Sequence, residues 1–268
     1  MHPQLTTLHF HGISWPIGSY GVLLTLALGV GALLALWRGK QAGLEEGALI
    51  SSLALAIAFG FVGAFACSVG VRFIQLGSLS AALAQPGIVF YGALIGGAAG
   101  LSIGARSFGL PLLAAWEAML PALPIAHAIG RVGCFFGGCC FGAHTELPWG
   151  VTYPGEMNAR HPWPLYEAAV LCVLALLFWR APTARAGTCS GSENANPSSV
   201  PGRRALRYVL CYACARPLLE PLRGDAVRGV FGLVSTSQVI SLAIIAACSY
   251  ALTLPALVQA VERSRTSA

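Results

Sequence analysis

A stretch near the C-terminal end of the chain carries the polar side chains best suited to chemistry. Four of them recur at intervals of three or four residues, the spacing of one face of an α-helix: Tyr212, Arg216, Glu220 and Arg223. A guanidinium group can hold a phosphate through paired hydrogen bonds, so two on one face favour a site for an anionic headgroup. The alternative is that Arg216 and Glu220 only neutralise each other as a buried ion pair.

A second polar group opens a glycine-rich stretch. His127 and Arg131 are four residues apart, so they lie one turn apart if a single helix runs through both. Gly130 and Gly133 would let the backbone approach a ligand closely. The alternative for Arg131 is that its side chain extends to the membrane interface and caps a helix end.

A third group lies at residues 160–167, which read Arg-His-Pro-Trp-Pro-Leu-Tyr-Glu. Pro162 and Pro164 predict an extended segment that leads into a helix. Glu167 then enters the membrane boundary, where a carboxylate needs a cationic partner. A structural ion pair and a ligand contact both remain open for it.

Three of the nine cysteines cluster in the sequence, at Cys134, Cys139 and Cys140, with His144 close behind. Their spacing, C-x4-C-C-x3-H, matches no standard zinc pattern. We therefore predict neither a metal nor any other cofactor, with a structural metal and a redox-active thiol pair as minor alternatives. Most of the other cysteines lie in apolar blocks, where cysteine acts as a small packing residue.

Composition places these groups in a membrane protein. Of 268 residues, 56% are hydrophobic and 10% are charged, whereas a soluble domain has about 25% charged residues. The apolar residues form long blocks, which favours helices over a transmembrane barrel. We predict an all-α, polytopic membrane helical bundle in a single domain, residues 1–268. Its seven candidate spans, with six as the fallback, are residues 19–37, 48–69, 87–105, 110–129, 165–179, 206–222 and 231–254.

Two irregular segments interrupt the spans. Residues 130–164 are rich in Gly, His and aromatic residues and predict a small ordered cap at the outer membrane edge, with Trp163 among its interfacial anchors. Residues 181–204 are rich in Ser, Pro, Gly and Asn and predict a disordered cytoplasmic linker. No Lys or Arg precedes the first span, so we expect a retained helix rather than a cleaved signal peptide.

The basic residues predict the orientation. With seven spans, most of them fall in one set of loops, which should be cytoplasmic. The N-terminus then faces outward and the C-terminus lies in the cytoplasm, in a bacterial plasma membrane. The net charge of +6 is accounted for by this asymmetry beside anionic lipid and implies no nucleic-acid partner.

These motifs, in this order, resemble the prolipoprotein diacylglyceryl transferase family. Residues 130–142 resemble its Gly-Arg-x-Gly-Asn signature with the loop that follows, and residues 160–167 resemble its His-Pro-x-Gln-Leu-Tyr-Glu segment. Residues 212–223 resemble its Tyr-x-x-x-Arg-x-x-x-Glu-x-x-Arg helix. Shorter likenesses lie at 19–21, to Trp-Tyr-Gly, and at 235–238, to Ser-x-Gln. The resemblance covers nearly the whole chain except the predicted linker.

The resemblance implies a seven-helix membrane fold and a reaction. The family moves the diacylglyceryl group of phosphatidylglycerol onto the lipobox cysteine thiol of a prelipoprotein and releases glycerol phosphate. Arg131 and Arg216 would clamp the phosphate, where charge develops, and Glu220 would orient Arg216. The expected substrate-binding residues are Tyr20, Cys134, Tyr166, Glu167, Tyr212, Glu220 and Arg223.

The chain departs from the family pattern at positions that bear on catalysis. Tyr91 stands where the family has a functionally important His, and Cys134 and Pro164 replace an Asn and a Gln. A phenol with a pKa of about 10 is a poor base at neutral pH, so His127 is a hypothetical substitute. The enzyme interpretation expects Arg131, Arg216 and Tyr91 to converge on one cavity.

Two other interpretations remain. The chain could be a diverged paralogue, which either binds lipid without catalysis or transfers to another acceptor. A transporter or channel would show internal pseudo-repeats, and the sequence shows no fixed-period repeat.

Overall fold

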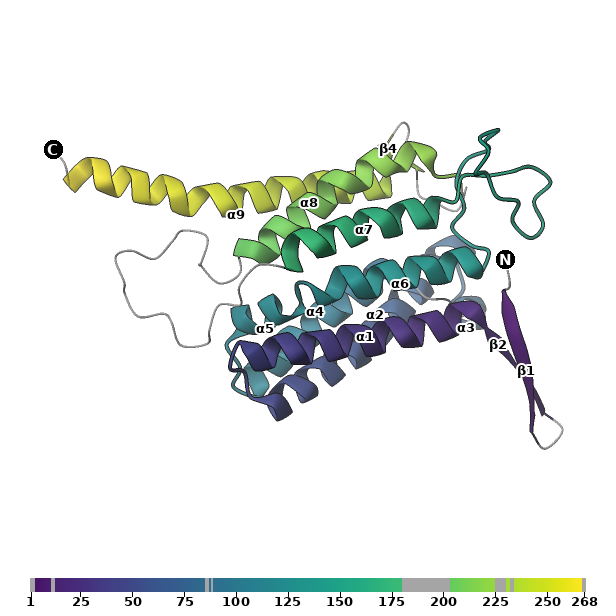
Figure 1. The fold of residues 1–268 in the computed structure, drawn as a ribbon, viewed down its shortest axis with the longest axis horizontal. Helices are drawn as coiled ribbons and strands as arrows, with labels where there is room; N and C mark the ends of the chain where they lie inside the picture. The colour runs from purple at the N-terminus through teal and green to yellow at the C-terminus, as the bar shows by residue number, and fades with distance from the viewer. Residues whose placement is uncertain are drawn as a thin grey trace. The chain divides into compact units, whose positions relative to one another are not determined.

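Helices dominate the computed structural model, which describes residues 3–10, 13–84, 87, 89–179, 203–224, 230–231 and 234–266 (Figure 1). The prediction of a mostly helical membrane protein is confirmed. The helices are α1 (Ser19–Gln41), α2 (Glu46–Leu76), α3 (Leu79–Ala84), α4 (Phe90–Ser107), α5 (Leu112–Met119), α6 (Ala122–Phe136), α7 (Trp163–Trp179), α8 (Arg203–Leu219) and α9 (Thr236–Thr266).

Each predicted span contains a helix, but the fourth is divided. Residues 110–129 were predicted as one span, whereas α5 ends at Met119 and α6 begins at Ala122. Pro121 stands at the break as the residue before α6, where its missing N–H and its ring disfavour a continuous helix. Helix α6 then runs on to Phe136, well past the predicted end, and so carries both His127 and Arg131.

Among the described residues, two helices are long and apolar enough to cross a membrane by themselves. These are α1 and α2. The pair α5 and α6 adds a third if the two are taken as one bent span, and α7 is a shorter apolar helix. The count of seven spans therefore stays a prediction.

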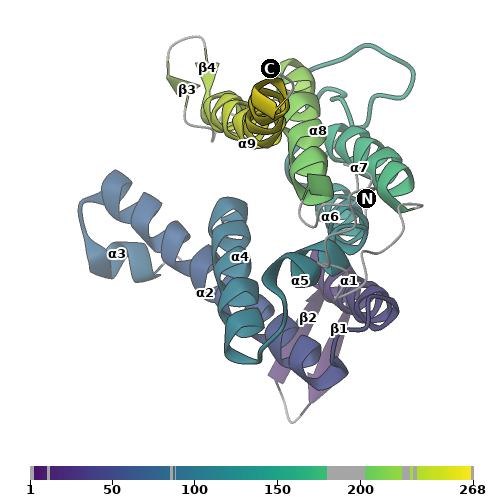
Figure 2. The ribbon, with the colours of Figure 1, turned by 90° about the vertical axis from the view of Figure 1, so that its left-hand side faces the viewer.

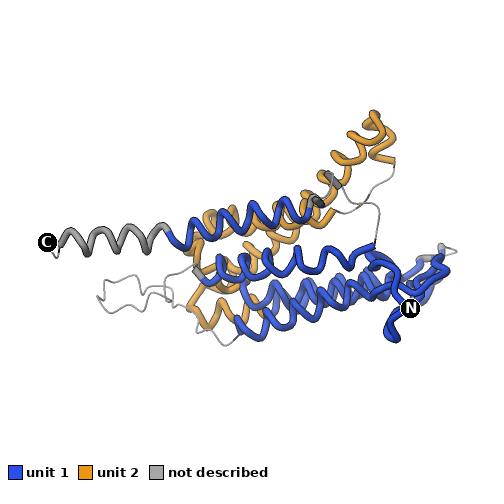
Figure 3. Tube along the Cα trace, turned by 90° about the horizontal axis from the view of Figure 1, so that it is seen from above, with its two compact units in different colours: residues 1–33, 120–182, 203–268 blue, residues 34–119, 183–202 orange. Residues whose placement is uncertain are grey.

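The chain divides into two compact units (Figure 3). One comprises the described parts of residues 1–33, 120–182 and 203–268, and the other centres on residues 34–119. In the first unit, α6 packs on α7, α7 on α8 and α8 on α9, a succession that Figure 2 shows with the helices viewed roughly end-on. Leu120, Leu174 and Tyr208 form one buried apolar cluster there, and Ala128, Ala168 and Leu171 form another.

In the second unit, α2 and α4 lie against each other along a seam of glycines. A Cβ atom on Gly92 would collide with the carbonyl oxygen of Gly63, and one on Gly96 with that of Phe59. Small residues allow two apolar helices to approach this closely and gain packing energy without a polar contact.

Two short hairpins depart from the all-α prediction. Strands β1 (Gln4–Phe10) and β2 (Ile13–Gly18) pair antiparallel, with Leu8 opposite Trp15 and Phe10 opposite Ile13. Strands β3 (Val230–Phe231) and β4 (Val234–Ser235) pair in the same way. In the sequence only two residues, His-Gly, separate the first two strands, which is a hairpin signal that a prediction based on apolar blocks does not use.

The structure describes the predicted cap region but only the end of the predicted linker. Residues 130–136 and 163–164 are helical, so the irregular part of the cap region is 137–162. Backbone bridges hold this loop, joining Gly142 to Arg223 and Arg160 to both His144 and Val151. The predicted linker, 181–204, lies outside the described residues except for its last two, which begin α8.

Candidate active site

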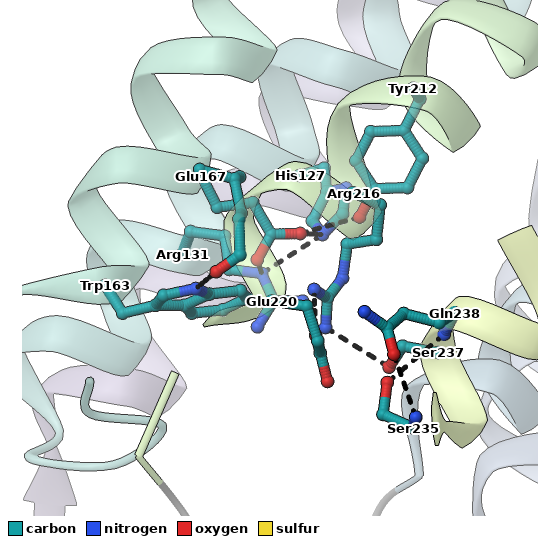
Figure 4. A network of polar contacts seen from close by, with 11 residues as sticks. His127, Arg131, Trp163, Glu167, Tyr212, Arg216, Glu220, Ser235, Ser237 and Gln238 are labelled. Carbon is teal, nitrogen blue, oxygen red and sulfur yellow. Dashed lines mark hydrogen bonds and ion pairs between the residues drawn. The ribbon is translucent and has the colours of Figure 1, made fainter. Parts of the chain in front are cut away.

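A buried carboxylate on α7 contacts polar side chains from two other helices (Figure 4). Glu167, in the first turns of α7, is fully buried. From α6, Arg131 places its Nε 2.9 Å from one carboxylate oxygen of Glu167. From α8, the Tyr212 hydroxyl donates to the other oxygen at 2.6 Å. The cationic partner that the sequence required for Glu167 is therefore Arg131.

His127 belongs to the same network. Its Nε2 lies 3.8 Å from Glu167 Oε1 and accepts from Arg131 Nε at 3.3 Å. The predicted one-turn separation of His127 and Arg131 is confirmed, because α6 runs through both. An imidazole nitrogen that accepts a hydrogen bond carries no proton, so this geometry leaves a basic lone pair facing the guanidinium.

A second ion pair lies on α8 and the short 3-10 helix η2 (Glu220–Leu222) that follows it. Arg216 and Glu220 are both buried, and Arg216 NH1 lies 2.5 Å from Glu220 Oε2. The other terminal nitrogen of Arg216 donates to Ser237 Oγ on α9 at 3.3 Å. Arg216 is thus fixed from two sides, with the i,i+4 pairing that the sequence predicted.

Trp163 joins the two ion pairs. The guanidinium carbons of Arg131, Arg216 and Arg223 lie 5.4, 4.8 and 4.7 Å from its ring centroid, within the range of cation–π attraction. The indole N–H donates to the Leu219 carbonyl oxygen at 2.8 Å. The sequence predicted an interfacial anchor at Trp163, and this was wrong, because the side chain is fully buried.

The arrangement can bind an anion. Within the described network, three guanidinium groups surround one aromatic ring, and Glu167 and Glu220 each pair with one of them. Guanidinium groups keep their charge when buried and match a phosphate geometrically. Each carboxylate fixes one guanidinium in place, which prepares the site for a ligand before the ligand arrives.

The remaining predicted residues lie around this network or apart from it. Tyr166 contacts the loop, where its hydroxyl accepts from Trp149 Nε1 at 2.8 Å and lies 3.1 Å from His161 Nδ1. Tyr20 on α1 is partly exposed and lies beside Gly133 of α6. Tyr91 belongs to α4 in the other compact unit, with its ring edge against Phe90. Its convergence with the arginines stays a prediction.

Cys134 does not stand alone. The sulfur atoms of Cys134, Cys139 and Cys140 all lie within 4.8 Å of one another. Hydrogen bonds from the other two thiols, together with the charges of Arg131 and Arg223, lower the pKa of the Cys140 thiol against the opposing effect of burial. The sequence spacing had not predicted that the three thiols meet.

Sequence reasoning gave Ser237 no role, although it holds Arg216. The only signal was its place in residues 235–238, where Ser235 and Gln238 also exchange hydrogen bonds, Ser235 N to Gln238 Oε1 at 3.0 Å and Gln238 N to Ser235 Oγ at 3.2 Å. These bonds fix the start of α9 and thereby the position of Ser237.

Apolar helices around a cluster of arginines define an integral membrane protein with a candidate site for an anionic ligand. Comparison with known proteins agrees, since the sequence profile of the prolipoprotein diacylglyceryl transferases matches residues 7–254. The chain belongs to this family.

Individual relatives are similar over most of their length. Phosphatidylglycerol–prolipoprotein diacylglyceryl transferase 2 of Clostridium perfringens is 30% identical over 85% of this chain and 87% of its own. The phosphatidylglycerol–prolipoprotein diacylglyceryl transferase of Clostridium tetani is 30% identical over 84% and 88%. That of Synechococcus elongatus is 28% identical over 91% and 84%.

Proposed function

We propose that this chain transfers the diacylglyceryl group of phosphatidylglycerol to the lipobox cysteine of a prelipoprotein. The names of its relatives support the two substrates, phosphatidylglycerol and a prolipoprotein. The observation that carries the proposal is the set of three guanidinium groups around Trp163. A phosphodiester headgroup is the anion that a membrane brings to such a site.

Arg131 and Arg216 act on the leaving phosphate. In the reaction, a sulfur atom attacks the glyceryl CH2 carbon, and the electron pair of the C–O bond passes to the phosphate. Negative charge therefore grows on the phosphate in the transition state, where preorganised cations stabilise it most. Glu167 positions Arg131, whereas Glu220 and Ser237 position Arg216.

The acceptor thiol must lose its proton, because the thiolate is the nucleophile. His127 is the candidate base, and its Nε2 lone pair faces Arg131. When Arg131 engages the phosphate, this lone pair is released to accept a proton. Arg131 would then couple lipid binding to activation of the acceptor.

We place the site at the outer side of a bacterial plasma membrane, beneath an outward-facing cap. The distribution of Lys and Arg supports seven spans, an outward N-terminus and a cytoplasmic C-terminus. This side is also where a secreted prelipoprotein would present its cysteine.

A lipidation assay tests the proposed function. The chain is expressed in bacteria depleted of their own diacylglyceryl transferase, and a lipobox reporter is followed by its mobility shift and lipid label. We expect lipidation from the unmodified chain and at least ~100-fold less from Arg131→Ala, the scale of losing one charge-stabilising donor. Arg106→Ala is the matched control, since this exposed arginine lies at the end of α4, in the other compact unit.

Absence of lipidation from a well-expressed, membrane-inserted chain would contradict the proposal. The alternative would then be a diverged lipid-binding paralogue or a transferase with another acceptor, and Tyr91, in place of the family's His, is the residue that favours it. Binding of phosphatidylglycerol vesicles by such an inactive chain, weakened in Arg131→Ala, would identify the lipid-binding alternative.

A further inference from the structure

Three thiols meet where α6 ends. Cys134 lies on the last turn of α6, and the chain then folds back through Gly138, at φ 73°, to bring Cys139 and Cys140 beside it. The Cys139 amide donates to the Cys134 carbonyl oxygen at 3.1 Å, which holds the turn in place. Cys140 itself adopts a φ of 59°, a left-handed conformation that is uncommon outside glycine and is often found at functional sites.

The donor set fits a thiophilic metal. In a tetrahedral zinc site with Zn–S bonds of about 2.3 Å, the sulfur atoms lie roughly 3.8 Å apart. The three sulfur atoms here lie within 4.8 Å of one another, so a small inward rotation of the side chains would bring them to that spacing. All three cysteines are free thiols, and thiolate ligands select zinc and copper(I) over hard cations.

The surroundings offer a hydrogen-bond donor for a bound thiolate. Tyr153 packs against Phe135 and Phe141, with ring centroids 6.2 and 5.4 Å away, and is almost fully buried. Its phenol oxygen has no hydrogen-bond partner among the described residues. The phenol lies close enough to the three cysteines for a thiolate charge to act on it. Metal-bound ligands commonly need such outer hydrogen bonds.

Charge and exposure complete the site. Zinc with three thiolates carries a net charge of −1, and the guanidinium groups of Arg131 and Arg223 act on the cluster. Cys134 is buried, Cys140 is half-buried and Cys139 is exposed. The cluster is therefore closed toward α6 and open on one side, as a zinc site with three protein ligands and one exchangeable position requires.

We propose that Cys134, Cys139 and Cys140 bind one zinc ion as thiolates, and that the fourth zinc position receives the acceptor cysteine. This inference rests on the proposed transferase function. It assigns activation of the acceptor to a group other than the histidine that Tyr91 replaces.

The step balances without an oxidant or reductant. The acceptor thiol displaces water from zinc and gives up its proton to a base such as His127 or to water, which forms a zinc-bound thiolate. A sulfur electron pair then attacks the glyceryl CH2 carbon, and the C–O electron pair leaves with the phosphate. The product thioether is neutral and a weak zinc ligand, so it dissociates. The released proton and glycerol phosphate complete the balance.

Metal content gives the first test, and it needs no activity. Full-length protein purified in detergent without chelator should hold about one zinc per chain, as a single site requires. Cys134→Ser, Cys139→Ser and Cys140→Ser should each lose most of the metal. Cys172→Ser, at an exposed position on α7, should keep it. Replacing zinc by cobalt(II) should give the thiolate-to-metal charge-transfer absorption of a sulfur-ligated site.

Alkylation of the unmodified protein provides a test that does not depend on whether a variant folds. Added zinc should slow alkylation of the three thiols, and a chelator should restore it, whereas Cys172 should react at one rate throughout. Equal rates with and without zinc would overturn the proposal. So would copper in place of zinc, or a disulfide joining any two of the three cysteines in the purified protein.

The lipidation assay separates this inference from the proposed function. Chelation that strips the zinc should abolish lipidation, and restored zinc should recover it. Full lipidation by zinc-free protein would overturn the zinc proposal and leave the transferase function intact. Zinc-loaded protein that lipidates no lipobox reporter would overturn the assigned acceptor and the transferase function with it.

Discussion

The helices of the two compact units are held together by different kinds of contact. In the first, α6, α7 and α8 meet around buried charges, and the contacts that matter are an ion pair at 2.9 Å and a hydrogen bond at 2.6 Å. In the second, α2 and α4 meet along glycines, whose added Cβ atoms would collide with the backbone of the facing helix. The first unit needs particular functional groups, whereas the second needs only the absence of side-chain volume.

This difference predicts two kinds of mutational outcome. A change of chemistry at constant size should remove activity from the first unit and leave the fold. A change of size at constant chemistry should disturb the fold of the second unit. Three substitutions test this contrast, and they are given in order of decreasing expected effect.

The largest effect is expected from Arg216→Lys. Lysine keeps the charge but loses the planar fork that pairs with Glu220 and Ser237 and stacks on Trp163. Lipidation should fall by ~100-fold, the scale of one misplaced stabilising donor, while the elution profile in detergent stays unchanged. Arg106→Lys, at an exposed arginine of the second unit, is the control. Retained activity in Arg216→Lys would mean that Arg216 contributes only its positive charge and that the geometry of its guanidinium group is not needed.

The second largest effect is expected from Gly92→Ala, which should lower the stability of the fold. The added Cβ atom would collide with the Gly63 carbonyl oxygen, and overpacking of this kind costs about 1–3 kcal/mol. The thermal unfolding temperature in detergent should fall. Gly70→Ala is the control: it lies on α2, the helix that faces α4, with nothing within 4 Å of the new atom, and it should leave the temperature unchanged or raise it. Equal effects from both would mean that the seam is not tightly packed.

Tyr212→Phe should have the smallest effect of the three. It removes only the 2.6 Å hydrogen bond to Glu167 and keeps the ring, whose edge-on contact with His127 has a centroid distance of 5.6 Å. A hydrogen bond to a charged group contributes about 1.5–3 kcal/mol, and Arg131 still holds Glu167. We expect a roughly tenfold loss of lipidation. A Tyr208→Phe variant, at a buried tyrosine on the same helix, α8, should keep full activity.

Much of the first unit's site could be predicted from the sequence, because residues three or four apart in a helix are neighbours in space. The four-residue steps from His127 to Arg131 and from Arg216 to Glu220 each became a contact. Ser19 was correctly expected to begin a helix, since a long apolar block opens there.

What escaped prediction depends on backbone turns and on contacts between helices. The three cysteines meet through a positive φ at Gly138 and at Cys140, which residue spacing does not encode. Trp163 was assigned to the membrane interface because aromatic residues are common there, yet the guanidinium groups around it come from two other helices and the segment that follows η2. The break at Pro121 was hidden by the apolar residues on both sides.

Backbone hydrogen bonds hold the start of the loop after α6, residues 137–162, to the segments on both sides of it. Its Gly142 and Ala143 exchange backbone hydrogen bonds with His161 just before α7, and Ala143 also donates to Leu222 at 2.9 Å. Gly224 closes the far side by donating to Phe141 at 3.2 Å. Moving this loop away from the helices would break each of these hydrogen bonds, at about 1 kcal/mol for each. It would also move Arg223 away from the Trp163 indole. If the proposed function holds, we therefore expect a lipid to reach the arginines sideways, between helices, from the plane of the bilayer.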